Sequence, residues 1–281
     1  MIDLHTHSTC SDGSESPGRV VELAAEAGCT AVSLTDHDGL FGIAPAAERA
    51  HEMGIRFVSG CEVSSTSDGG PIHLLCYFVA DGHNPLADLL GRLRVDRETR
   101  NAAIVKRFAE LGIPLFYEEV RAESHGSVVG RPHFAAALVR RGIVGSIDEA
   151  FGRYLRAGAP AYAARNPVAP SLVIERARAS GAVVVLAHPL SAGLSPDELD
   201  ALVSGLATDG LAGLEARYGN YDPATREDLV RLALRHGLVA TGGSDFHGTY
   251  RPDIAVGTGT GDLAVPDACL DELAAQARER A

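Results

Sequence analysis

The 281-residue sequence predicts an α/β protein whose parallel strands close into a barrel. Seven short runs are apolar and rich in β-branched residues, and segments with helical periodicity separate most of them. Near-continuous apolar strands that alternate with amphipathic helices are typical of a parallel sheet with helices on its outer face. Seven such units exceed the needs of a typical doubly wound sheet, and they favour a barrel.

The expected strands and helices follow in order along the chain. The strands are 2–7, 31–37, 55–63, 72–79, 182–189, 210–217 and 238–247. The helices between them are 17–28, 44–53, 171–180 and 225–236. The first helix has clear boundary signals, with Ser16 as N-cap, Pro17 in its first turn and Gly28 at its end.

The alternation of strands and helices stops between residues 80 and 170. This stretch instead predicts helices, at 85–111, 118–123, 132–141 and 146–155, with loops rich in Gly, Pro and Ala between them. We therefore expect residues 1–82 and 168–281 to form the barrel. Residues 83–167 are expected to form a small inserted helical subdomain that caps the substrate.

Composition excludes several classes of protein. No apolar run approaches the roughly 20 residues that a membrane helix needs, so we expect no membrane partner. The start, MIDLHTHS, lacks the basic and apolar regions of a signal peptide. The five cysteines are scattered and form no CxxC pair, which indicates free thiols in a reducing compartment. These observations together predict a cytoplasmic location.

The net charge of −12 disfavours binding to long duplex nucleic acid, which needs a basic surface. The charge is uneven, because residues 92–165 sum to +5 and the rest of the chain to −17. An acidic body joined to a basic segment is what we expect if the body binds cations and the segment helps to hold an anion. Chance unevenness on a solvated surface is the alternative.

Nearly every expected strand carries an imidazole or a carboxylate, mostly at its C-terminal end. His5 and His7 are two residues apart on the first strand, so both project to one side of it. The C-terminal ends of barrel strands converge on one face, where the active sites of such folds are built. The candidate metal ligands are His5, His7, Asp12, His37, Glu62, His73, His188, Asp245 and His247.

Mixed imidazole and carboxylate ligands suit Zn, Mn or Fe, and the absence of a cysteine pair disfavours a closed structural zinc site. Glu215 ends the sixth expected strand and could lie behind the ligands, although a salt bridge with a neighbouring arginine is the preferred interpretation.

The ordered blocks HTH…SDG, LTDHD, GCEV…H, AHP and SDFH span essentially the whole chain. In this order they resemble the polymerase-and-histidinol-phosphatase (PHP) family of metal-dependent phosphoesterases. The resemblance implies a distorted (β/α)7, TIM-like barrel, in agreement with the seven strands. It also implies two or three divalent ions. By the family pattern, His5, His7, Glu62 and Asp245 hold one ion. Glu62 bridges to a second ion with His73 and His188, and Asp12, His37 and His247 hold a third.

Two further blocks lie in the insertion, GRPHFA (130–135) and APAYA (159–163). They resemble the branch of the family that removes phosphate from nucleotides, including nucleoside 3′,5′-bisphosphates, and some members of that branch trim short RNA from its 5′ end. The resemblance implies that Arg131 and His133 hold the substrate phosphate, and the planar fork of arginine suits this task. In the alternative interpretation neither residue binds phosphate: Arg131 is an ordinary arginine at the start of a helix, and His133 is a surface histidine.

These expectations define a mechanism. A metal-bridging hydroxide held by Glu62 attacks phosphorus while Arg131 and His133 hold the remaining oxygens. The sequence does not identify the general acid. The expected substrate is a small phosphate monoester, a nucleoside 3′,5′-bisphosphate or monophosphate, and the 5′ end of a short RNA or histidinol phosphate are alternatives.

A metal-dependent amidohydrolase is the rival within enzymes, because it also places HxH on a first barrel strand. Many such enzymes bridge two metals with a carboxylated barrel lysine, whereas the single lysine here, Lys106, falls in the expected insertion. A non-catalytic accessory domain is the rival outside enzymes. This interpretation is disfavoured because all nine positions carry a side chain that can bind a metal ion, whereas a domain without activity would be expected to have lost some of these side chains.

Overall fold

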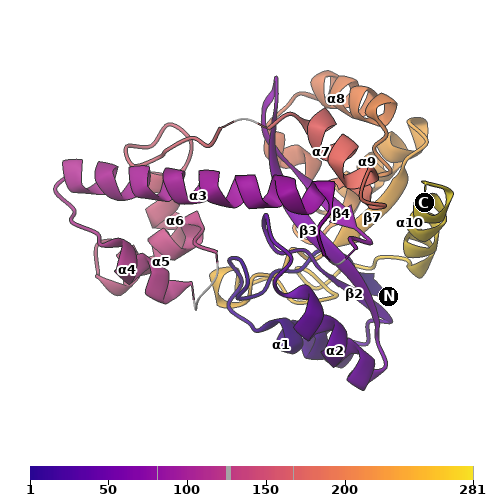
Figure 1. Cartoon of the computed structure of the whole chain (residues 1–281), viewed down its shortest axis with the longest axis horizontal. Helices are drawn as coiled ribbons and strands as arrows, with labels where there is room; N and C mark the ends of the chain where they lie inside the picture. Colours follow the sequence, from indigo (N-terminus) through magenta and orange to yellow (C-terminus); the bar gives the residue numbers. More distant parts are fainter. Residues whose placement is uncertain (81, 125–127, 167, 281) are drawn as a thin grey trace.

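The seven strands of the protein lie side by side in sequence order, as the computed structural model of residues 1–80, 82–124, 128–166 and 168–280 describes them (Figure 1). The strands are β1 (Ile2–Asp3), β2 (Ala31–Leu34), β3 (Arg56–Ser67), β4 (Gly70–Tyr77), β5 (Val183–Leu186), β6 (Gly213–Tyr218) and β7 (Val239–Gly243). Just beyond the strand ends, Thr6 pairs in parallel with Phe246, which brings β7 back to β1. The predicted barrel is therefore confirmed.

Strand β4 departs from the predicted parallel sheet, because it runs antiparallel to both β3 and β5. The cause is local. Ser67 pairs with Gly70, which leaves the Asp68–Gly69 dipeptide as a two-residue hairpin turn. A parallel neighbour would need a crossover of a dozen or more residues. The reversed direction brings the start of β4 to the barrel end where the parallel strands finish.

Six helices cover the barrel: α1 (Pro17–Glu26), α2 (Ile43–Met53), α7 (Pro170–Arg178), α8 (Pro196–Asp209), α9 (Pro223–Arg235) and α10 (Asp267–Arg280). The sequence predicted four of them within a few residues, and α8 and α10 were not predicted. The start of α1 is as expected, because the Ser16 hydroxyl accepts a hydrogen bond from the Arg19 backbone N–H at 3.3 Å.

Helix α10 closes one end of the barrel. Its Leu270 and Leu273 are buried in a cluster with Ile2, Val183 and Val239, which stand at the beginnings of three parallel strands. Burial of these side chains supplies the hydrophobic stabilisation of this end. The polar residues that the strands carry are therefore left at the opposite end.

The inserted segment contains α3 (Pro85–Glu110), α4 (Tyr117–Glu123), α5 (Arg131–Arg140) and α6 (Ile147–Ala150), followed by a π-helical turn (Phe151–Leu155). Figure 1 shows α4, α5 and α6 beside the far end of α3, away from the strands. We call α4–α6 with the distal half of α3 the helical lobe. The assignment of residues 83–167 to a separate subdomain stays a prediction.

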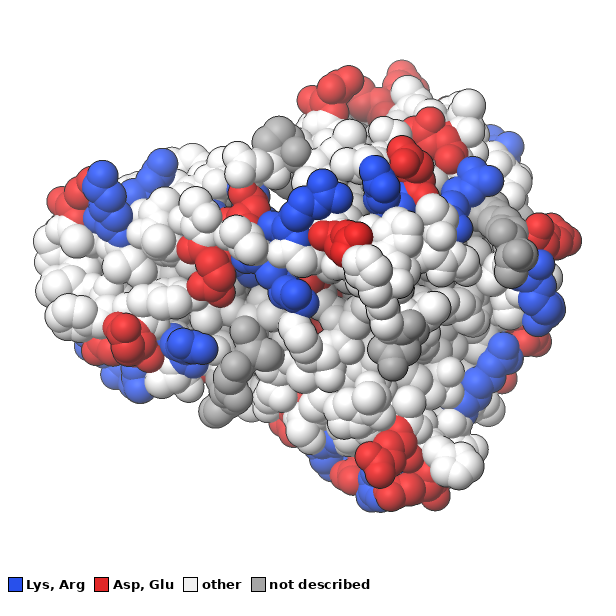
Figure 2. Space-filling view, viewed as in Figure 1, with Lys and Arg blue, Asp and Glu red and all other residues white. Residues whose placement is uncertain are grey.

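Helix α3 belongs to two cores at once. Leu86 and Leu90 near its start are buried against the barrel, whereas Ile104 and Phe108 are buried in the core of the helical lobe. Basic side chains gather around the middle of the face shown in Figure 2, where the lobe meets the barrel. Within the described residues, no helix is both long and apolar enough to cross a membrane.

Candidate metal centre

All nine predicted metal ligands gather at the end of the barrel opposite α10. Most of them form three groups whose ligand atoms lie within 4.8 Å of one another. The groups are His5, His7, Glu62 and Asp245; His37, Glu62 and His73; and His7, Asp12, His37 and His247. The ninth residue, His188, joins through its Nε2, which lies 2.9 Å from Glu62 Oε1.

The first group is the most deeply buried. The Nε2 atoms of His5 and His7 lie 3.1 Å apart. Glu62 Oε2 is 3.4 Å from His5 Nε2 and 3.2 Å from His7 Nε2. Asp245 Oδ1 repeats the same two distances from the other side. Four donor atoms thus face a common point, as they do around a metal ion.

Glu62 lies between the groups and presents a different oxygen to each. Its Oε2 faces His5 and His7, and lies 3.1 Å from His37 Nδ1. Its Oε1 lies 2.8 Å from His73 Nδ1 and 2.9 Å from His188 Nε2. A carboxylate with its two oxygens turned toward separate sets of imidazoles is arranged to bridge two cations.

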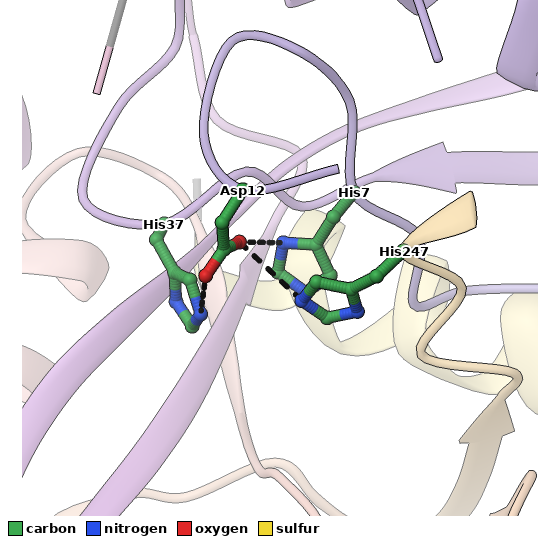
Figure 3. A group of neighbouring side chains, drawn as sticks. All are labelled: His7, Asp12, His37 and His247. Atoms are coloured by element: carbon green, nitrogen blue, oxygen red, sulfur yellow. Dashed lines mark ion pairs between the residues drawn. The ribbon is translucent and has the colours of Figure 1, made fainter. Parts of the chain in front are cut away.

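The third group centres on Asp12, in the loop after β1 (Figure 3). One carboxylate oxygen points to His37 Nε2 at 3.6 Å, and the other to His247 Nε2 at 3.3 Å and His7 Nδ1 at 3.8 Å. Asp12 Oδ1 and His37 Nδ1 are buried, and in the described part of the chain their close contacts with His247 and Glu62 do not have hydrogen-bond geometry. Buried polar atoms of this kind call for a ligand.

Protonation behaviour agrees with a site built for cations. Burial lowers the pKa of His7, but hydrogen bonds to Asp245 and Glu62 outweigh it and raise that pKa to about 10. Burial raises the pKa of Asp245, yet His5 and His247 outweigh it and hold that pKa well below its ordinary value. The carboxylates therefore demand positive charge close by. The mixed nitrogen and oxygen donor set suits divalent ions that supply this charge.

Glu215 holds two of the ligands from behind, which corrects the expected salt bridge with an arginine. Its carboxylate is fully buried; Oε1 lies 2.8 Å from His5 Nδ1, and Oε2 accepts a hydrogen bond from the His188 backbone N–H at 2.7 Å. A carboxylate on the far nitrogen of a ligand imidazole fixes its tautomer and orientation. Its place on a strand among ligand-bearing strands was the signal for this role, although Glu215 lies inside β6 and not at its end.

Three other supporting residues were not predicted. Tyr218 donates a hydrogen bond to Asp245 Oδ2 at 2.7 Å, and Arg251 pairs with the same oxygen. Asp36 anchors the loop that carries Asp12, because its carboxylate accepts hydrogen bonds from the Ser8 backbone N–H at 2.8 Å and the Ser11 hydroxyl at 2.6 Å. These contacts limit the positions available to the ligands.

Backbone strain concentrates at this end of the barrel. Four non-glycine residues in the described chain have positive φ, and three of them are Asp38 (51°), His188 (23°) and Asp245 (57°). Two of these are candidate ligands, and Asp38 follows a third. Such conformations cost about 1–3 kcal/mol each and persist where the surroundings enforce them, commonly at functional sites.

Two adjoining cavities open onto the cluster. One of about 310 Å³ is lined by Glu62, His188 and Asp245, and one of about 510 Å³ by Asp12 and Arg131; both reach His37 and His73. These volumes suit small-molecule ligands.

The two predicted phosphate-binding residues differ in placement. Arg131 lines the larger cavity, with its guanidinium 5.9 Å and 5.8 Å from the ring centres of Phe151 and Tyr162. His133 is fully buried and lines neither cavity, and its Nδ1 accepts a hydrogen bond from the Gly130 backbone N–H at 2.9 Å. His133 is therefore not a surface residue, and its contact with phosphate stays a prediction without geometric support.

Comparison with known proteins agrees with the geometry. Residues 3–93 match the PHP domain family. A 5′-3′ exoribonuclease of Haemophilus influenzae is 33% identical over 87% of this chain and 89% of its own length. The chain belongs to the PHP family.

A 3′,5′-nucleoside bisphosphate phosphatase of Chromobacterium violaceum is 31% identical to this PHP protein, over 88% of this chain and 87% of its own. A crystal structure from Bifidobacterium adolescentis, classed among the metal-dependent phosphoesterases, is 30% identical with a TM-score of 0.87. That alignment covers 98% of this chain and 96% of the other. The protein is a metal-dependent phosphoesterase, as the sequence predicted.

Proposed function

We propose that this protein hydrolyses phosphate monoesters of small nucleotides, namely nucleoside 3′,5′-bisphosphates or monophosphates. The observation that carries the proposal is the Glu62 carboxylate between two ligand groups, beside a cavity lined by arginines. The phosphatase relative from Chromobacterium violaceum supports a nucleotide substrate.

The nine clustered residues would hold two or three divalent ions, of Mn, Fe or Zn. His5, His7, Glu62 and Asp245 form one site, and Glu62, His73 and His188 a second. Asp12, His37 and His247 form a third. Bound ions supply the Lewis acidity that makes hydroxide available at neutral pH and neutralises phosphoryl charge. Glu215, Tyr218 and Arg251 keep the ligands oriented, so that little reorganisation is needed during reaction.

Arg131 binds and orients the reacting phosphate in this proposal. Its guanidinium is mostly buried at the wall of the cavity that also exposes Asp12 and His37. A guanidinium pairs with two phosphate oxygens at once, which fixes the direction of the scissile bond. The ring centres of Phe151 and Tyr162 lie 5.9 Å and 5.8 Å from the guanidinium carbon of Arg131, at the outer limit of a cation–π contact.

Removal of the 5′-terminal nucleotide from short RNA is the second candidate function. A further cavity of about 470 Å³ adjoins the cavity of about 310 Å³ at the candidate ligands. The two share the lining residues Ile147, Asp148, Tyr250 and Arg251. The cleft thus continues past the metal centre, which leaves room for more than one nucleotide. The exoribonuclease relative supports this alternative.

An amidohydrolase mechanism that uses a bridging lysine has no support here. The single lysine, Lys106, is exposed on α3 and lies near Glu110 at 4.0 Å, and it lines neither cavity beside the ligands. The cytoplasmic location also stays a prediction.

One assay series tests the proposed function. The purified protein, loaded with Mn, Fe or Zn, is given nucleoside mono- and 3′,5′-bisphosphates, short 5′-phosphorylated RNA, histidinol phosphate and an amide or lactone. We expect phosphate release from the mononucleotides, with bound metal measured per chain. Turnover of the amide or lactone alone would refute the proposal.

Two variants locate the activity. Asp245→Ala should lose metal and activity together, whereas the exposed control Asp228→Ala should keep both. Arg131→Ala should raise KM or lower kcat at unchanged metal content. Loss of metal from the Arg131 variant would contradict its role on phosphate.

A further inference from the structure

Four arginines line the larger cavity together with three of the candidate metal ligands. They are Arg97, Arg100, Arg131 and Arg165, of which two come from α3, one from the start of α5 and one from the chain returning to the barrel. This accumulation of positive charge exceeds what one reacting phosphate needs.

Only part of this charge is balanced within the protein. The buried Asp38 carboxylate pairs with Arg97 Nη2 at 2.5 Å and Arg165 Nη1 at 2.7 Å, and Arg165 also reaches Asp96 at 3.3 Å. Among the described residues, no carboxylate pairs with Arg100 within 4.0 Å. Arg100 is 6% exposed, and its Nε has no hydrogen-bond partner in the described chain.

The surroundings of Arg100 intensify the imbalance. Burial lowers the pKa of Arg100 to about 9, and Arg97, Arg131 and Arg165 push it in the same direction. Like charges held together in a buried wall are costly unless an anion joins them. A phosphate with two charges and several acceptor oxygens relieves this cost and matches the guanidinium fork.

The position of the cluster relative to the metals defines what kind of molecule carries that phosphate. The same cavity is lined by Asp12, His37 and His73 and also by the rings of Phe151 and Tyr162. A ligand with one phosphate at the metal ligands can therefore extend along the cavity and present a second anionic group to Arg100.

We propose that Arg100, with Arg97 and Arg165, binds a second phosphate group of the substrate, distinct from the phosphate that is hydrolysed. This inference rests on the proposed function. It makes the arginine cluster the feature that selects doubly phosphorylated substrates. The second phosphate belongs either to a nucleoside 3′,5′-bisphosphate, as a monoester with up to two charges, or to the next linkage of a short 5′-phosphorylated oligonucleotide, as a diester with one charge. Both offer anionic phosphate oxygens to the guanidinium groups.

The test compares kcat/KM for three substrates: adenosine 5′-monophosphate, adenosine 3′,5′-bisphosphate and a 5′-phosphorylated diadenylate. Arg100→Gln should lower the ratio of bisphosphate or dinucleotide turnover to monophosphate turnover by about 10- to 100-fold, the range for a charge-assisted hydrogen bond. The matched control is Arg92→Gln, an exposed arginine two turns earlier on α3, which should leave the ratio unchanged.

Each outcome is decisive. A fall in the bisphosphate ratio identifies the mononucleotide as the source of the second phosphate, and a fall in the dinucleotide ratio alone identifies the oligonucleotide. If the wild-type protein turns over these substrates and Arg100→Gln changes neither kcat/KM ratio, this inference is overturned and the proposed function still stands. Absence of phosphate release from all three substrates overturns the proposed function instead.

A melting curve shows whether the Arg100→Gln protein is folded. If it is not, a second variant replaces it in the test. Arg100→Lys keeps the positive charge and loses the two-pronged geometry. We expect its ratio to fall at least about 3-fold, because only part of the contact survives. An unchanged ratio in a folded Arg100→Lys protein also overturns the inference.

Discussion

Asp38 connects the barrel to the middle of α3 and to the chain that returns from the insertion, and its replacement by asparagine gives the sharpest test of how these parts are held together. The side chain is fully buried, four residues after the end of β2. Its Oδ2 accepts from Arg97 on α3 and from Arg165 on the returning chain, while Oδ1 accepts from the Ser64 backbone N–H at 3.0 Å. Asparagine tolerates the positive φ of 51° and preserves the shape, so the change removes mainly the charge.

The expected loss follows from this geometry. Removing one partner from a buried ion pair costs about 3–5 kcal/mol, because it leaves uncompensated charge behind. Here two guanidiniums lose their shared carboxylate, although Arg165 keeps Asp96 and is partly exposed. We therefore expect about 3 kcal/mol of destabilisation, at the lower end of that range. For a chain of this size this lowers Tm by about 5 °C.

Thermal unfolding of the metal-loaded protein measures the effect, with Asp228→Asn as matched control. Asp228 also pairs with an arginine, Arg231, but both side chains are more than half exposed. An exposed pair contributes little, so the control should show no measurable shift. A shift of less than about 2 °C for Asp38→Asn would refute the argument that this buried ion pair holds α3 and the returning chain against the barrel.

Three further predictions concern the metal centre and the thiols. Glu215→Gln should weaken metal binding by roughly 10- to 100-fold, because His5 loses the carboxylate behind it; unchanged affinity in a metal titration would contradict that role. Chelation with EDTA should lower Tm, and Mn should restore it, since ligands that bind only the folded state stabilise it; an unchanged Tm would count against metal binding at the buried cluster. A thiol reagent at pH 8 should modify at most one cysteine per native chain. The candidate is the half-buried Cys10, because the other four are buried and burial raises the pKa of Cys29 and Cys269 to about 12. Rapid reaction of two or more thiols would contradict the described packing.

The barrel and the gathering of the ligands could be read from the sequence because both depend on local patterns. Apolar runs of strand length mark the strands, and the placement of His37 and His188 just beyond strand ends follows from where those runs stop. Glu62 was expected at the end of its strand, but it lies inside β3, which continues to Ser67. The Asp-Gly signal at Asp68 that reverses β4 was also present in the sequence. It was outweighed by the assumption that every strand in an alternating pattern is parallel.

Other features depend on contacts between residues far apart in the chain, and no local pattern encodes them. Glu215 meets His5 across 210 positions, and Asp38 meets Arg165 across 127. The sequence offered an acidic residue and several arginines, but not their pairing. The burial of His133 has a similar origin, because the packing of the helical lobe decides which face of α5 turns inward.

The continuity of α3 has a consequence for how substrates enter. At 1.5 Å per residue, its 26 residues span about 39 Å without a break. One end is fixed in the barrel core and the other in the core of the lobe. A continuous helix contains no hinge about which the barrel and the helical lobe could rotate. Proteins that close over their ligands have such hinges in loops. We therefore expect admission to be governed by the fixed dimensions of the opening, so that a bulky base or a longer chain is rejected at the entrance by its size.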